Sequence, residues 1–220
     1  AALELWPDTD LVIGIGSRLE LPYMRWNASA DPRDQPQGPP LIRIEIDSEE
    51  MARLKPDVGV LADSAEGLRE LINAAAGQKS NRGDGGDRVN EARARAAVKV
   101  AEIQPQKQYL DAVRKVLPRD GFYVGELTQT GYVSYFGFEV YEPRTYVMPG
   151  FQGTLGYGFS TALGVKAANP GKAVVSLNGD GGFLFGLGEL ATAVQEKLGV
   201  VAVVFNNRAL GAIREGQKAA

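Results

Sequence analysis

Two polar motifs lie one strand–helix–strand unit apart, and each directly follows an apolar run. The first is Asn178-Gly179-Asp180-Gly181-Gly182, and the second is Asn206-Asn207. The 24 residues from 182 to 205 suffice for a turn, a helix over Leu187–Leu198 and a strand. Because such a crossover joins parallel strands, both motifs are expected at the carboxyl edge of one parallel sheet, where ligands of open α/β folds bind.

The side chains of these motifs suit a metal-bound diphosphate. The Asp180 carboxylate and the Asn207 amide oxygen can meet on one hard cation, while the glycines leave backbone N–H groups open to a phosphate. The alternative is a surface turn followed by a strand-ending cap, both common uses of these residues. Gly83-Asp84-Gly85 repeats the tripeptide without a preceding strand or a following Asn-Asn, and we interpret that copy as linker.

With this spacing, the region resembles the diphosphate-binding signature of thiamine diphosphate enzymes, in particular acetolactate synthase large subunits. The resemblance implies that Mg²⁺ binds Asp180, Asn207 and the backbone carbonyl of Ala209. It also implies that the cofactor diphosphate lies against Gly179, Gly181 and Gly182.

A glycine-rich segment, Pro149–Gly158, precedes an expected helix that runs to about Ala168. Tight helix packing alone accounts for such glycines. The segment also resembles the family's pyrimidine-binding turn. That resemblance implies that the Gly153 carbonyl receives the exocyclic amine of the cofactor and that the side chain of Leu155 holds the cofactor in a bent shape.

Residues Phe122–Thr130 are expected to form a strand followed by a loop. In the resembled family this loop contacts diphosphate or substrate, and the matching positions are Thr128 and Gln129. Ordinary polar loop residues are the alternative interpretation.

Composition excludes several classes of site and partner. The chain has no cysteine and no histidine, which rules out disulfides, thiolate zinc sites and a Ser-His-Asp triad. Reactions that the remaining side chains do not readily catalyse would therefore depend on a cofactor or metal. A net charge of −3 gives no reason to expect nucleic acid or an anionic membrane as partner, and no apolar run approaches the roughly 20 residues that span a bilayer. We expect a cytoplasmic protein.

The predicted fold class is α/β, with two Rossmann-like parallel-sheet domains. Residues 1–77 form a central α/β domain, 78–105 a linker and surface helix, and 106–220 a truncated thiamine diphosphate-binding fold. Strands are expected at 11–17, 41–47 and 58–61 in the first domain.

The first domain invites a dinucleotide-binding interpretation through Gly14-x-Gly16. Leu19 stands where that fingerprint has its third glycine, and Asp47 lies further along than the usual acid. FAD or ADP binding therefore stays open, as does a non-catalytic adenine-nucleotide-binding regulatory module. Residues Tyr23–Trp26 suit either a ligand surface or a packing cluster, and we favour packing.

The function implied by the resemblance is that of a thiamine diphosphate- and Mg²⁺-dependent 2-oxo acid decarboxylase or carboligase. The family's cofactor-activating glutamate belongs to a domain that these residues do not represent. The chain is therefore expected to be a fragment that is inactive alone, with no catalytic residue of its own. A 2-oxo acid substrate and a homodimer or homotetramer follow from the same resemblance, and acyl-CoA lyase chemistry stays open.

Overall fold

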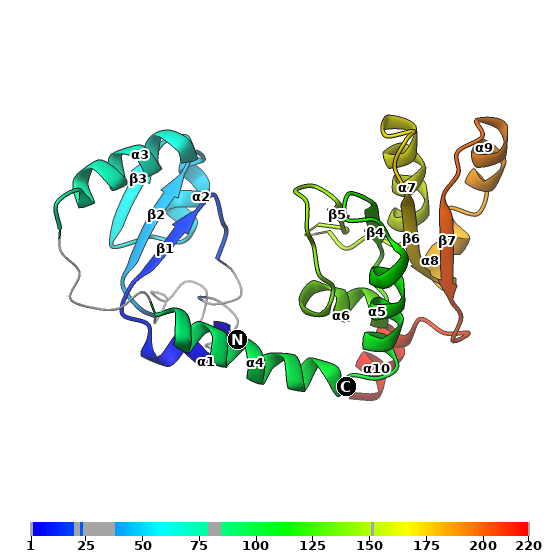
Figure 1. The fold of residues 1–220 in the computed structure, drawn as a ribbon, viewed down its shortest axis with the longest axis horizontal. Coiled ribbons are helices and arrows are strands. Elements are labelled where there is room, and N and C mark those ends of the chain that lie inside the picture. Colours follow the sequence, from blue (N-terminus) through cyan, green and yellow to red (C-terminus); the bar gives the residue numbers. More distant parts are fainter. Residues whose placement is uncertain (1, 20–22, 24–37, 79–84, 151, 220) are drawn as a thin grey trace. The chain divides into compact units, whose positions relative to one another are not determined.

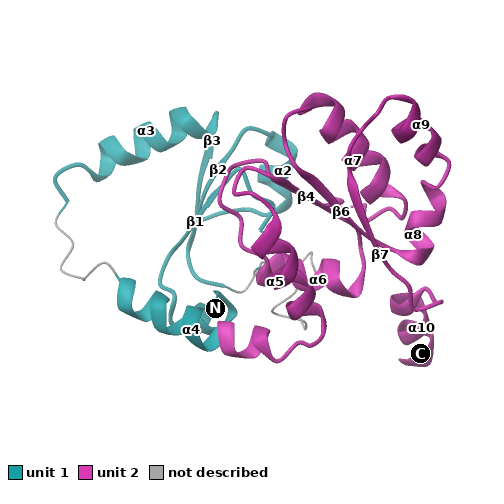
Figure 2. Ribbon diagram, turned by 45° about the vertical axis from the view of Figure 1, so that its right-hand side comes forward, with its two compact units in different colours: residues 1–96 teal, residues 97–220 magenta. Residues whose placement is uncertain are grey.

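A computed structural model describes residues 2–19, 23, 38–78, 85–150 and 152–219. Contacts divide the chain into two compact units, Ala1–Ala96 and Ala97–Ala220, coloured separately in Figure 2. The division falls inside the segment 78–105, which the sequence predicts to be a linker and surface helix.

Unit 1 is a small α/β unit around a parallel sheet in the order β1-β2-β3 (Figure 1). Its strands lie within the three predicted ranges. They are β1 (Val12–Ile15), β2 (Leu41–Glu45) and β3 (Val58–Leu61), and the helices are α1 (Ala2–Leu5), the 3-10 turn η1 (Trp6–Asp8), α2 (Ser48–Arg53), α3 (Ser64–Ala75) and the first part of α4 (Gly86–Ala101).

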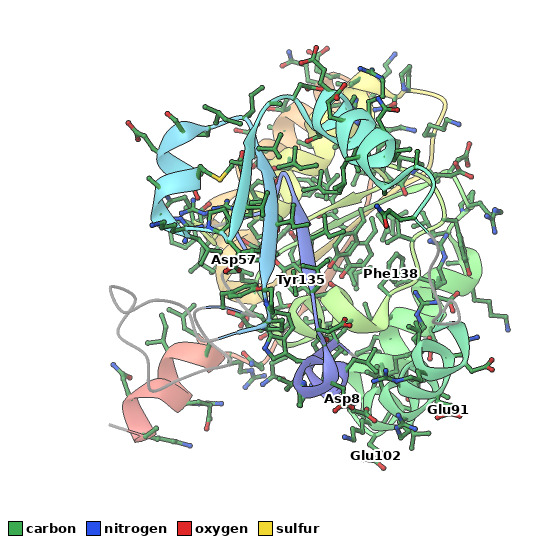
Figure 3. All side chains as sticks on the ribbon, turned by 90° about the vertical axis from the view of Figure 1, so that its left-hand side faces the viewer. Asp8, Asp57, Glu91, Glu102, Tyr135 and Phe138 are labelled. Carbon is green, nitrogen blue, oxygen red and sulfur yellow. The ribbon has the colours of Figure 1, made fainter. Side chains whose placement is uncertain are left out.

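Asp47 has a structural role in unit 1. Its Oδ1 accepts hydrogen bonds from the backbone N–H groups of Glu49 (2.8 Å) and Glu50 (3.3 Å), so it is the N-cap of α2. Tyr23 is buried and donates to the carbonyl of Pro39, while Met24–Trp26 lie outside the described residues. Asp57, labelled in Figure 3, accepts a 2.7 Å hydrogen bond from the Leu41 N–H at the start of β2. Asp47 and Asp57 thus accept hydrogen bonds from backbone N–H groups at the start of a helix and of a strand.

Unit 2 contains a second parallel sheet, in the order β5-β4-β6-β7. The predicted α/β class with two parallel sheets is confirmed. The elements of unit 2 after α4 are α5 (Gln106–Val116), β4 (Phe122–Gly125), α6 (Gln129–Gly137), β5 (Tyr146–Val147), α7 (Tyr157–Ala168), β6 (Val174–Gly179), α8 (Asp180–Phe185), α9 (Glu189–Gln195), β7 (Val201–Phe205) and α10 (Gly211–Ala219).

The two faces of this sheet are covered by different helices. One core cluster joins α5 and α6 to Tyr123, Val175 and Leu177, and Phe138, the residue that follows α6 and is labelled in Figure 3, packs against it. The other cluster joins Ala162 of α7 to Val124 and Val174. Successive residues of β4 and β6 therefore alternate between an α5/α6 face and an α7 face, as strand geometry requires.

Two of the predicted local structures are wrong. The segment expected to be a turn followed by one helix over Leu187–Leu198 instead forms α8, which begins at Asp180, and the shorter α9. Glycines 186 and 188 separate these helices. The loop expected up to Thr130 is interrupted by α6, because the Thr128 hydroxyl accepts a 2.8 Å hydrogen bond from the Gly131 N–H and caps that helix.

Strand β7 is the last in the strand order and presents apolar side chains to solvent. Val201 is 64% exposed, and Val204 is also exposed. Among the described helices, none combines the length and apolar character needed to cross a lipid bilayer.

Candidate functional site

The register of β6 and β7 brings the two polar motifs to one edge of the sheet. Gly179 pairs with Phe205, so Asp180 and Asn206 each follow a paired strand-end residue. Asp180 is half-buried and is the first residue of α8. The predicted meeting of the two motifs at the carboxyl ends of parallel strands is thus present in the backbone.

The turn after β7 is shaped by its own side chains. The Asn206 Oδ1 accepts from the Arg208 N–H (3.0 Å), and the Asn207 Oδ1 accepts from the Ala209 N–H (3.1 Å). Arg208 has a φ of 55°, in the left-handed region that a residue with a side chain rarely adopts. This turn leaves Asn207 exposed, with its amide nitrogen near Gly211 at the start of α10.

Thr128 and Gln129 lie at the same edge. A Cβ on Gly179 would be 3.2 Å from the Thr128 Cγ2, and a Cβ on Gly211 would be 3.3 Å from Asn207 Nδ2 and 4.0 Å from Gln129 Nε2. Gln129 also accepts a 3.2 Å hydrogen bond from Gln106. Thr128 therefore reaches the first motif, and Gln129 the surroundings of the second.

The glycine segment before α7 approaches the edge from the α7 face. Gly153 has a φ of 57°, and a Cβ there would lie 2.5 Å from Leu127 Cδ1. Gly156, with a φ of 84°, has no room for a Cβ because Phe185 of α8 would be 2.7 Å away. Leu155 is 38% exposed, so its side chain is open to a ligand. The start of α7 and helix α8 are thus in contact.

Comparison with known proteins identifies this region. Residues 128–220 match the family model described as the thiamine pyrophosphate enzyme, C-terminal TPP binding domain. Residues 128–220 belong to the thiamine pyrophosphate enzyme family. Thiamine pyrophosphate and thiamine diphosphate are two names for one cofactor, so the predicted family and cofactor class are confirmed.

Relatives of the thiamine pyrophosphate enzyme family match nearly the whole chain. A probable 2-ketoarginine decarboxylase of Pseudomonas aeruginosa is 31% identical over 96% of this chain and 37% of its own length. A probable acetolactate synthase large subunit of Methanocaldococcus jannaschii is 28% identical over 96% of this chain and 36% of its own length. The structure of a thiamine diphosphate-dependent 4-hydroxybenzoylformate decarboxylase of Rhodococcus jostii has a TM-score of 0.68 and 26% identity, covering 96% of this chain and 38% of that one. The chain therefore spans well under half the length of these relatives, whose names give no support to a non-catalytic nucleotide-binding module.

A buried glutamate that the sequence analysis did not select lies inside this TPP-binding region. Glu126 directly follows β4 and is 1% exposed, and its Oε1 accepts a hydrogen bond from the Gly156 N–H. Burial raises the pKa of the Glu126 carboxyl, while the backbone N–H groups of Gly156 and Tyr157 act to lower it. In the sequence, Glu126 is recognisable as an acidic residue directly after a buried strand. Its position continues the alternation of that strand's side chains between the two faces of the sheet.

The raised pKa of Glu126 predicts a pH-dependent stability. The stabilisation linked to a raised carboxyl pKa is complete below the pKa of an unfolded glutamate and is lost as pH rises through the folded pKa. The stability of Glu126→Gln relative to the unsubstituted chain should therefore increase with pH. Urea unfolding followed by far-UV circular dichroism at pH 5 and pH 8 measures this difference.

A suitable control is Asp120→Asn. The hydrogen bond from Lys172 lowers the pKa of Asp120, so the stabilisation by Asp120 is lost only as pH falls below the ordinary aspartate range. The stability of Asp120→Asn relative to the unsubstituted chain should therefore be the same at pH 5 and pH 8. An unchanged difference between Glu126→Gln and the unsubstituted chain at the two pH values would contradict the assignment.

Proposed function

We propose that the protein is part of a thiamine diphosphate- and Mg²⁺-dependent enzyme that decarboxylates or ligates 2-oxo acids. The observation that carries the proposal is the pairing of Gly179 with Phe205, which brings Asp180 and the Asn206–Ala209 turn to one sheet edge inside the TPP-binding region.

The oxygen atoms at this edge suit Mg²⁺. Asp180 offers a carboxylate, Asn207 an amide oxygen with a second lone pair, and Ala209 a backbone carbonyl, all ligand types that Mg²⁺ prefers. They leave coordination positions for phosphate oxygens and water. Among the described residues, no group of three or more His, Cys, Asp or Glu side chains is gathered, so a site with one carboxylate would depend on oxygens from amide, backbone and ligand.

The remaining predicted residues complete the proposed cofactor site. Gly181 and Gly182 would donate backbone N–H groups to the diphosphate beside Gly179, and Thr128 and Gln129 would contact it from the β4 side. The Gly153 carbonyl and the Leu155 side chain would hold the pyrimidine end. When bound, the cofactor supplies the electron sink for cleavage next to a carbonyl, while the residues of this chain bind and orient it.

Spectral mapping of ligand contacts tests the proposal. In a two-dimensional NMR titration of the 220-residue chain, thiamine diphosphate with Mg²⁺ should shift the amides of 179–182 and 207–209. EDTA should reverse those shifts. An absence of shifts at millimolar ligand would overturn the proposed cofactor site, and Mg²⁺-independent shifts confined to residues 12–47 on adding ADP or FAD would favour the nucleotide-binding alternative.

The wider assembly belongs to the same proposal. A 2-oxo acid substrate and a homodimeric or homotetrameric enzyme are typical of the proposed activity. Cytoplasmic location stays a prediction from the sequence.

A further inference from the structure

Glu126 lies on the side of the sheet that faces α7. Tyr123 belongs to the cluster on the α5/α6 face and Val124 to the cluster on the α7 face, so strand alternation places Glu126 on the α7 face. A fully buried carboxyl at this position is unusual, because carboxyl groups are costly to remove from water unless they are paired.

The carboxyl of Glu126 is tied to the start of α7. Its Oε1 accepts from the Gly156 N–H, and Gly156 precedes α7 without a side-chain cap of its own. The N–H groups at the start of a helix lack partners within the helix. Glu126 thus caps α7 from another element of the fold.

The same carboxyl lies directly against the diphosphate-binding motif. A Cβ added to Gly182 would overlap the Cδ and both carboxyl oxygens of Glu126, and a Cβ on Gly158 would be 3.2 Å from the Glu126 Cβ. One side chain therefore contacts the glycines of both segments that are proposed to hold the cofactor.

Stability alone does not explain this carboxyl. Its Oε2 is buried and has no hydrogen-bond partner in the part of the chain that the structure describes. A buried oxygen of this kind costs free energy rather than contributing it. A buried carboxyl with this cost in stability points to a role in geometry.

We propose that Glu126 is a positioning residue of the cofactor site, whose carboxyl sets the spacing between the Gly153–Gly156 segment and the Gly181–Gly182 segment. The inference rests on the proposed function, because these segments would hold opposite ends of thiamine diphosphate. Without the carboxyl, the start of α7 loses its hydrogen-bond acceptor and Gly182 loses the group against which it packs.

Three substitutions at Glu126 test the role through cofactor affinity. Glu126→Gln keeps the size and an acceptor oxygen, so its affinity for thiamine diphosphate with Mg²⁺ should stay within about threefold of the unsubstituted chain. Glu126→Ala removes the contact and Glu126→Asp withdraws it by one methylene, and both should weaken binding by about tenfold or more, the scale of losing a group that orients ligands. If Glu126→Ala does not fold, Glu126→Asp carries the comparison.

A control residue separates positioning from general stability. Ser134 is 2% exposed, and its hydroxyl bonds the Gly131 carbonyl (2.6 Å) and the Tyr146 hydroxyl (2.8 Å), neither of which belongs to the two glycine segments. Ser134→Ala should lower stability but leave affinity unchanged. Amide hydrogen exchange at Gly156 and Tyr157 should accelerate in Glu126→Ala and Glu126→Asp, and not in Glu126→Gln or Ser134→Ala.

The outcomes distinguish this inference from the proposed function. If the unsubstituted chain binds and both Glu126→Ala and Glu126→Asp bind equally well, the positioning role is overturned while the cofactor site stands. Failure of Glu126→Gln to retain binding would also overturn it. If the unsubstituted chain does not bind thiamine diphosphate with Mg²⁺, both the proposed function and this inference are overturned.

Discussion

Replacing Asp180 by alanine is expected to weaken Mg²⁺-dependent binding of thiamine diphosphate by about 100-fold or more, equivalent to about 2.7 kcal/mol. Asp180 is the carboxylate among the three proposed ligands, so its loss leaves two neutral oxygens to hold a dication. Its location in the first turn of α8 means that the substitution also removes a favourable interaction with the helix N-terminus, worth roughly 0.3–1 kcal/mol. The expected loss of affinity is well above that structural contribution.

Asp120→Ala is the matched control for Asp180→Ala. It removes the same charge from the same unit, but Asp120 precedes β4 and therefore lies at the amino end of the strands, where it pairs with Lys172. In the NMR titration, Asp120→Ala should bind thiamine diphosphate and Mg²⁺ with the same affinity as the unsubstituted chain. If Asp180→Ala retained the unsubstituted affinity with Mg²⁺ present, Asp180 would not be a metal ligand.

The second large effect is expected from Gly131→Ala, which should destabilise unit 2 by about 3 kcal/mol or more. A Cβ at Gly131 would lie far closer to the Glu126 backbone carbonyl oxygen than the van der Waals contact distance of a carbon and an oxygen. A flexible side chain can rotate away from such a clash, but here the chain between β4 and α6 itself would have to move. That movement would carry Glu126 and Thr128 with it.

Gly164→Ala offers the opposite case in the same unit. Gly164 lies inside α7 with nothing within 4 Å of a Cβ position, so alanine should stabilise the helix by roughly 0.5–1 kcal/mol. Urea unfolding followed by far-UV circular dichroism, with hydrogen exchange in β4 and β6, measures both variants. Tryptophan fluorescence would be misleading because both tryptophans of the sequence, Trp6 and Trp26, come before unit 2. Equal stability of Gly131→Ala and the unsubstituted chain would contradict the predicted clash.

The sequence contained enough information for the sheets because strand signals are local. The apolar run Val58–Leu61, for example, coincides with strand β3. Helix α6 was missed because its start depends on the Thr128 hydroxyl and on a glycine that tolerates the adjacent carbonyl. The helix expected over Leu187–Leu198 was misplaced because α8 begins directly at a strand end, with glycines in a first turn that propensity disfavours.

Some residues of the candidate site could be selected from the sequence, and one became apparent only in the structure. Asp180 and Asn207 were selected because each comes just after a strand, which places both residues at the same edge of the sheet. The structure supplies what spacing alone does not give: Gly182 has no room for a side chain because the carboxyl of Glu126, the residue after β4, occupies the space. Glu126 escaped notice because a single acidic residue after a strand resembles any loop residue until its burial is known.

The open side of β7 has a practical consequence for the protein as a reagent. A strand at the end of a sheet retains backbone groups that can pair with another chain. The exposed side chains of Val201 and Val204 add apolar surface that favours such association. Charged or proline residues that commonly deter such pairing are absent from Val201–Phe205. Protein concentration therefore becomes an experimental variable, and dilute samples checked by light scattering are needed before any change in affinity is ascribed to a substituted side chain.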